Sequence, residues 1–161
     1  MPILSNPATG AYEYSPGEAK LQIANTDTTV TNSATLVPVT DLTFALGAYE
    51  RVVVKYNVFY TTTATGDFKY QLSIPATPTF YHAIKESNAP AAVALVTAVE
   101  VAEGATAATA ASGTDGYVRV TAVIENGATG GDVTFEFAQN TATAAQSAVV
   151  RNGSFVEVIR Y

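Results

Sequence analysis

After residue 20, most of the chain alternates between apolar and polar positions with a period of two. Residues 67–74 alternate without a break, with Phe68, Tyr70, Leu72 and Ile74 on one side and Asp67, Lys69, Gln71 and Ser73 on the other. Segments 49–60, 117–125 and 132–138 follow the same pattern. Successive side chains of a β-strand point to opposite faces, so each segment is predicted as a strand with one buried and one solvent-facing side.

Turn residues separate these strands at intervals of about 8 to 14 residues, which is typical of a sandwich or barrel. Residues 20–46 are predicted as two or three short strands broken at Pro38, because proline interrupts a strand ladder. The Gly-rich residues 126–132 are interpreted as a hairpin loop, and Asn152-Gly153 predicts a two-residue hairpin. About eight to ten antiparallel strands must hide their edges, so we predict an all-β, antiparallel jelly-roll β-sandwich.

Residues 89–116 are rich in alanine and fit two interpretations. Their composition permits a helix over 91–103. The β-branched residues of the same stretch favour a strand over 94–102, and we predict the strand. The small residues of 104–116 are predicted as a loop.

Residues 1–19 contain three prolines and no periodicity, so they are predicted as an extended arm without a helix or a paired strand. Residues 20–161 then form the jelly-roll domain. A frayed terminus is one interpretation of the arm. The other is that the arm binds a neighbouring subunit, because its apolar side chains are costly to leave in water. The candidate partner-binding residues are Ile3, Leu4, Tyr12 and Tyr14.

The composition favours lasting contact with other proteins. Hydrophobic residues make up 48% of the chain and charged residues only 14%, so an interface would bury few charges. The net charge of -6 and the scattered basic residues argue against a nucleic-acid partner. No signal peptide and no membrane span are visible, so we expect a soluble protein made in the cytoplasm.

Little catalytic equipment is present. The chain has no cysteine and one histidine, His82, and a single histidine among aromatic residues is usually packed or solvent-exposed. Glu100 with Glu103 and Asp132 with Glu136 are the nearest approach to a paired-acid site, but a solvated strand edge gives the same spacing. We therefore predict no enzymatic activity, no cofactor and no metal centre.

Three acids, Asp67, Asp115 and again Asp132, are interpreted as turn residues that bond their own backbone. A surface calcium site built from such loop acids stays open as an alternative. Nine tyrosines also leave stacking on carbohydrate open.

Residues 28–75 resemble a pattern frequent in proteins of tailed bacteriophages, in which a Thr/Asn/Ser strand leads to Asp-Leu-x-Phe, an aromatic strand and a Gly-Asp-Phe-Lys hairpin. The matching positions are Thr29, Val30, Asn32, Ser33, Thr35, Leu36, Val37, Asp41, Leu42, Phe44, Tyr49, Phe59, Tyr60, Gly66, Asp67, Phe68 and Lys69.

This resemblance implies a structural virion protein with a jelly-roll fold, of the capsid decoration or cement type. Such a protein would bind the major capsid protein on the outer capsid surface, commonly as a homotrimer, and would stabilise the shell. The alternative is a tail-fibre or baseplate module that binds a host glycan through the 61–66 and 126–131 loops.

Overall fold

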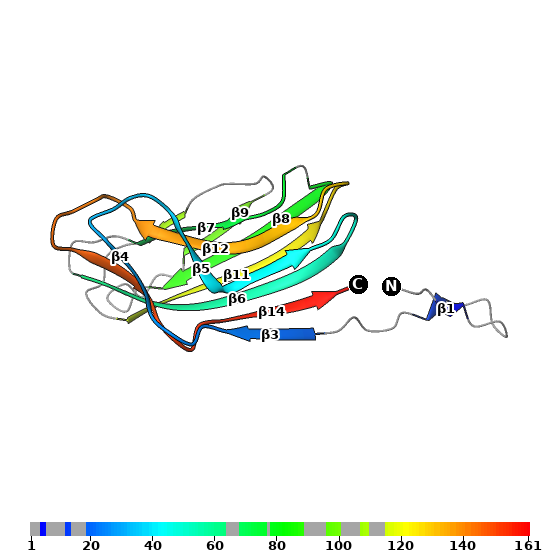
Figure 1. Ribbon diagram of the computed structural model, residues 1–161, viewed down its shortest axis with the longest axis horizontal. Helices are drawn as coiled ribbons and strands as arrows, with labels where there is room; N and C mark the ends of the chain where they lie inside the picture. The colour runs from blue at the N-terminus through cyan, green and yellow to red at the C-terminus, as the bar shows by residue number, and fades with distance from the viewer. Residues whose placement is uncertain are drawn as a thin grey trace.

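In the computed structural model of the chain, two antiparallel β-sheets pack face to face, and a separate two-stranded sheet lies near the N-terminus (Figure 1). It describes residues 4–5, 12–13, 19–63, 68–76, 78–88, 96–100, 107–109 and 115–161. Within these residues all regular structure is β-strand, and no helix is long and apolar enough to cross a membrane. The all-β prediction is therefore confirmed.

The larger sheet, called here the large sheet, is built around two long central strands. In spatial order it contains β3 (Ala19–Ile23), β14 (Phe155–Arg160), β6 (Arg51–Thr62), β11 (Asp115–Glu125), β8 (Phe80–Asn88) and β9 (Val96–Glu100). Two further strands extend it, since β13 (Ser147–Val150) pairs with β6 on one side and with β4 (Thr28–Thr31) on the other.

The second sheet, called the small sheet, has four strands. Their spatial order is β10 (Ala107–Thr109), β7 (Phe68–Ser73), β12 (Gly131–Gln139) and β5 (Val37–Leu46). The edge strand β5 therefore comes early in the sequence and pairs with the late strand β12.

The strand order is that of a jelly roll. The first and last body strands, β3–β4 and β13–β14, pair with each other and then with β6 and β11, while β5, β12, β7 and β10 make the facing sheet. This interleaving of two Greek keys defines the jelly roll and confirms the predicted fold class. The β8–β9 hairpin is an addition that widens the large sheet beyond β11.

The loops predicted as hairpins are crossovers between the sheets. Residues 126–130 join β11 in the large sheet to β12 in the small one, and β6 and β7 also lie in different sheets. The hairpin interpretations of 126–132 and of the Gly66–Lys69 turn are therefore wrong. A local turn signal specifies that the chain reverses, but the partner of each strand depends on distant residues.

Asn152-Gly153 is also not a hairpin, because β13 and β14 do not pair with each other. Both run antiparallel to β6, with Val150 opposite Tyr60 and Phe155 opposite Asn57. Residues 151–154 are thus an extended bulge in one long bent strand. Gly153 has the positive φ of 79° that favours glycine at this position.

Pro38 was predicted to break a strand, but it lies inside β5. It pairs with Glu136, whereas Thr43 pairs with Thr134, so β5 is strongly bulged between these points. β5 is an edge strand, and a bulged edge tolerates the missing N–H of proline.

In the alanine-rich stretch, Val96–Glu100 forms β9, which confirms a strand there rather than a helix. Ala107–Thr109 forms β10 and pairs with β7, so this part of the predicted loop 104–116 is a strand. The rest of the stretch up to residue 114 lies outside the described residues.

The arm also differs from its prediction. Leu4–Ser5 (β1) pairs antiparallel with Tyr12–Glu13 (β2), so the expectation of an arm without paired strands is wrong. A strand of two residues is too short to be recognised from an alternation of apolar and polar positions.

The core fills the space between the sheets, and the predicted inward faces are confirmed. Tyr56, Tyr60, Phe68, Phe135 and Phe137 are fully buried, and Tyr60 stacks on Phe68 with ring centroids 4.2 Å apart. The buried Tyr56 hydroxyl donates to the carbonyl of Leu42 at 3.3 Å, and burial raises its pKa.

Gly116 lies under the ring of Tyr60, which is its cross-strand partner. A Cβ atom at this position would lie 2.3 Å from Cζ of Tyr60. Only glycine lets the tyrosine ring lie across β11 and reach Phe68 in the small sheet.

Candidate interaction surface

The solvent-facing side of the large sheet is called here the outer face. It is formed by the odd-numbered residues of β3, β6 and β14, those of β11 from Tyr117 onward, and the even-numbered residues of β8 up to Glu86. Tyr161 extends it, because its N–H continues the β14 ladder by donating to the carbonyl of Arg51. Within the described residues, seven large hydrophobic side chains are exposed, and six lie on the outer face. These six are Leu21, Ile23, Phe59, Phe80, Ile84 and Tyr161. Single exposed apolar residues are ordinary, but their concentration on one sheet face marks an interaction surface.

The strand register arranges these side chains in rows across the sheet. One row runs Ile159, Val53, Val123 and His82, and its three apolar members are half-buried. The neighbouring row runs Leu21, Glu157, Lys55, Thr121 and Ile84. Across these five strands, apolar side chains thus lie beside a few polar and charged ones.

The charged residues of the outer face are paired with one another. Lys55 Nζ lies 3.4 Å from Glu157, and Arg119 lies 3.6 Å from Glu86. Arg51 forms an ion pair with Glu125 on the adjacent strand. Of the outer-face side chains that the structure describes, three cations and three carboxylates therefore balance each other.

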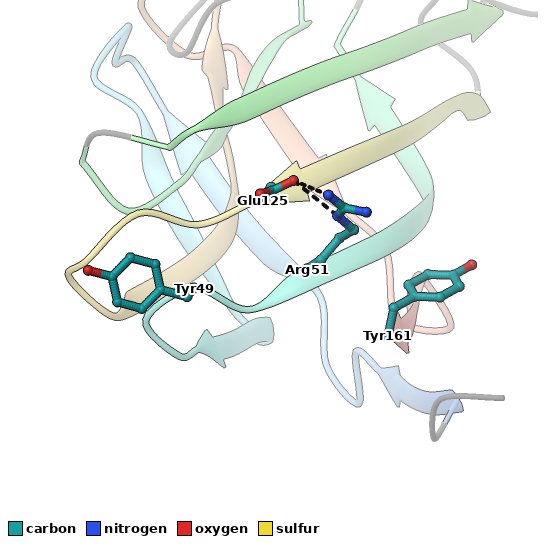
Figure 2. A pocket seen from close by; sticks show the side chains of 4 residues that line it. All are labelled: Tyr49, Arg51, Glu125 and Tyr161. Carbon is teal, nitrogen blue, oxygen red and sulfur yellow. Dashed lines mark hydrogen bonds and ion pairs between the residues drawn. The ribbon is translucent and has the colours of Figure 1, made fainter. Parts of the chain in front are cut away.

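A shallow depression lies at one end of the outer face, lined by Tyr49, Arg51, Glu125 and Tyr161 (Figure 2). The two tyrosines lie on either side of the Arg51–Glu125 ion pair. Tyr49 is the seventh exposed hydrophobic residue, with 74% of its surface accessible. An ion pair flanked by two aromatic rings can offer hydrogen bonds in the middle and stacking at both sides.

The crossover after β11 holds Tyr49 in place. The N–H of Tyr49 donates to the carbonyl of Gly127 at 2.8 Å, and its φ of 57° turns the chain sharply before β6. The side chain of Asn126 is buried and donates to the carbonyls of Gly47 and Thr129. The rim of the depression is therefore a hydrogen-bonded loop pair.

The predicted partner-binding side chains in the arm cannot be placed on this surface. Ile3 and Tyr14 lie outside the described residues, and for Leu4 and Tyr12 only the strand pairing is described. Their role as anchors stays a prediction.

The residues considered for chemistry are scattered. His82 is exposed on the outer face, and its ring meets Phe80 edge-on with centroids 6.5 Å apart. Glu136 accepts a hydrogen bond from Gln71 at 2.8 Å on the outside of the small sheet, and Asp132 is exposed near the start of β12. Glu103 and Asp67 lie outside the described residues. Within the described part of the chain, no group of three His, Cys, Asp or Glu residues could hold a metal ion.

Sequence reasoning missed the outer face, because it followed only the buried side of each strand. The signal was present, because Val53 and Phe59 occupy positions of β6 where a solvent-facing strand would carry polar residues. Phe155 and Ile159 do the same in β14. Strands that are apolar on both sides indicate a sheet covered on both faces.

No protein-family model and no curated protein sequence matches the chain. Among solved structures, Eiger TNF from S. frugiperda is similar at 8% identity, covering 91% of this chain and 94% of that one, with a TM-score of 0.43. The Gt strain structure of infectious bursal disease virus is similar at 11% identity and a TM-score of 0.25, covering 99% of this chain but 42% of that one. Both scores are below 0.5, and the fold assignment rests on the strand order.

Proposed function

We propose that this chain is a non-enzymatic structural protein of a virion, which decorates the outer surface of a capsid and stabilises it through protein–protein contacts. The observation that carries the proposal is the outer face, where six of the seven exposed large hydrophobic residues of the described chain gather on one sheet. A jelly-roll sandwich supplies a rigid support for such a contact surface. The resemblance of residues 28–75 to tailed-bacteriophage proteins supports the finer assignment to a capsid.

In this proposal the arm binds the major capsid protein. Its apolar residues Ile3, Leu4, Tyr12 and Tyr14 precede β3, which is an edge strand of the large sheet. An arm that begins at a sheet edge can leave the sandwich without disturbing its core. An added contact of at least about 1,000 Å² would favour the assembled shell by mass action.

Deletion of residues 2–15 tests this role. We expect the shortened protein to lose binding to capsids that lack the wild-type chain. Its thermal unfolding midpoint should stay unchanged, because the described core is built from residues between Ala24 and Val158. Co-sedimentation with purified capsids measures the binding. Unchanged occupancy of the capsid would contradict the proposal, and so would a copy number per virion that matches a single tail rather than the capsid lattice.

The depression between Tyr49 and Tyr161 favours a second candidate function, the binding of a glycan. It combines exposed aromatic rings with a charged hydrogen-bonding pair, and the predicted loop 126–131 holds its rim through Asn126 and Gly127. The other predicted loop, 61–66, lies partly outside the described residues.

A glycan array separates the two candidates. If the depression binds a glycan, the wild-type protein should give specific hits that Tyr49→Ala abolishes, because the stacking ring is removed. The matched control is Tyr117→Ala, which removes a half-buried tyrosine at the opposite end of the outer face. An array without hits would leave the structural role as the function of the chain.

A further inference from the structure

We propose that the outer face is a self-association surface, on which a second copy of this chain packs its own outer face. The inference shares with the proposed function only the view that this face contacts protein. It assigns the occupant of the face, and it makes the unit a dimer rather than the homotrimer that the phage resemblance implies.

The size of the outer face fits a stable interface. It spans the five strands β3, β14, β6, β11 and β8, and from Arg51 to Phe59 it is nine residues long. Three of the strands run along the whole length, whereas β14 has six residues and β3 five. With about 4.8 Å between strands and about 3.3 Å per residue, the face measures about 600 Å². Stable interfaces bury about 800 Å² on each partner, so the face is close to the size that a dimer needs.

The apolar content of the face also fits an interface centre. The half-buried row of Ile159, Val53 and Val123 crosses the middle strands, and Leu21 and Ile84 lie at the two ends of the next row. Burying these side chains against another copy would remove apolar surface from water without leaving a polar backbone group unpaired.

The charge distribution selects a second copy as the occupant. The whole chain has fourteen acidic and eight basic residues, and three of each pair within the outer face. The remaining eleven acidic and five basic residues carry the entire charge of -6. Two copies therefore repel each other over most of their surfaces, whereas two neutral outer faces can approach.

The internal ion pairs strengthen this argument. Lys55–Glu157 and Arg119–Glu86 are already satisfied within one chain, so the described side chains of the face present no unbalanced charge that would need an oppositely charged partner. A strongly acidic or basic protein surface gains nothing there, while an equally neutral and apolar surface does.

Sedimentation equilibrium of the purified full-length chain, without any capsid, tests the proposal. We expect a mass of twice 16.8 kDa at micromolar concentration. Ile84→Asp and Leu21→Asp should each raise the dimer dissociation constant at least about 100-fold, because each buries a charge against its copy. Thr40→Asp is the matched control, since it adds the same charge at an exposed position of the small sheet, and it should leave the dimer intact.

A cysteine scan gives a second measurement if an aspartate variant fails to fold. The chain has no cysteine, so Val53→Cys, Thr121→Cys and His82→Cys each introduce a single thiol near the centre of the face. Under mild oxidation, at least one of them should form a disulfide-linked dimer, because face-to-face packing brings some of these positions within about 7 Å of their partners. Thr40→Cys should stay monomeric on a denaturing gel.

Several results would overturn the proposal. A monomer at every concentration up to about 100 µM would do so, as would a trimer or a dimer that Ile84→Asp leaves unchanged. Failure of all three cysteines to cross-link would also overturn it. Loss of capsid binding on arm deletion bears on the proposed function alone, so the two ideas fail separately.

Discussion

The hydroxyl of Ser154 bonds the backbone of β6 at the point where the neighbouring strand bulges away. Its Oγ accepts a hydrogen bond from the N–H of Phe59 at 3.0 Å and lies within donating distance of the carbonyls of Arg151 and Phe59. Ser154 is fully buried, so water cannot take its place. One small side chain thus satisfies backbone groups that a regular strand would otherwise bond.

Ser154→Ala should therefore lower the free energy of unfolding by about 1–3 kcal/mol, because the N–H of Phe59 is left buried without a partner. Urea unfolding at neutral pH measures the change. Ser73→Ala, which removes the same hydroxyl from a half-buried position of β7 where water can reach it, should change it by less than about 0.5 kcal/mol. Equal effects of the two variants would contradict this role of Ser154.

At the scale of elements, two paired strands bend together. The segment between β3 and β4 lies beside the segment between β13 and β14, because Gly153 N–H donates to the carbonyl of Ala24 at 2.9 Å. Asp27 accepts a hydrogen bond from Asn152 N–H at 2.7 Å and pairs with Arg151 at 3.2 Å. These contacts hold the bend, which lets one pair of long strands curve around the core.

The Asn-Gly pair illustrates how far a local signal reaches. It correctly indicates a sharp change of backbone direction with a positive φ, which Gly153 has. It does not indicate which strands pair, because pairing depends on residues about 90 positions away in β6. The turn was therefore predictable from the sequence, but the strands that pair on either side of it were not.

At the scale of the molecule, Arg160 ties the two sheets together at one edge. It ends β14 in the large sheet, forms an ion pair with Glu50, and donates to the carbonyl of Ala45 in β5 at 2.9 Å. Burial by itself raises the pKa of Glu50, but hydrogen bonds from Arg160 and from the N–H of Gly47 outweigh it and lower the pKa. The ionised carboxylate is thus the form that the fold favours.

Because the pKa of Glu50 is lower in the folded state, its contribution to stability is present above the ordinary pKa of about 4.3 and is lost as the pH falls through the folded value. Glu50→Gln should therefore be less stable than wild type at pH 7, by up to about 1 kcal/mol for this partly exposed pair, and the difference should shrink below about pH 4. Urea unfolding at pH 7 and pH 3.5 measures both differences. A gap that is the same at the two pH values would contradict the assignment.

A control variant separates this tie from an ordinary surface ion pair. Glu157→Gln removes a carboxylate from the exposed Lys55–Glu157 pair, which joins strands of a single sheet. At pH 7 it should cost less than about 0.5 kcal/mol. If it lowers the free energy of unfolding as much as Glu50→Gln does, the contact of Arg160 between the sheets stabilises the fold no more than an ordinary surface ion pair.

By itself the sequence determined the all-β class, the long strands and the side of each strand that faces the core. These properties follow from a period of two, which any segment carries locally. The candidate anchors Ile3, Leu4, Tyr12 and Tyr14 also came from sequence and stay predictions. The outer face was detectable in principle, since Val53 and Phe59 interrupt the polar side of β6.

Only the tertiary structure decided which strands pair and where the exposed apolar residues meet. Leu21 in β3 and Ile84 in β8 are 63 positions apart, yet they end one row across the same sheet. Tyr49 and Tyr161 likewise meet at one depression from opposite parts of the chain. The physical reason is that alternation sets the face of a residue within its own strand, whereas strand order follows from contacts between distant segments.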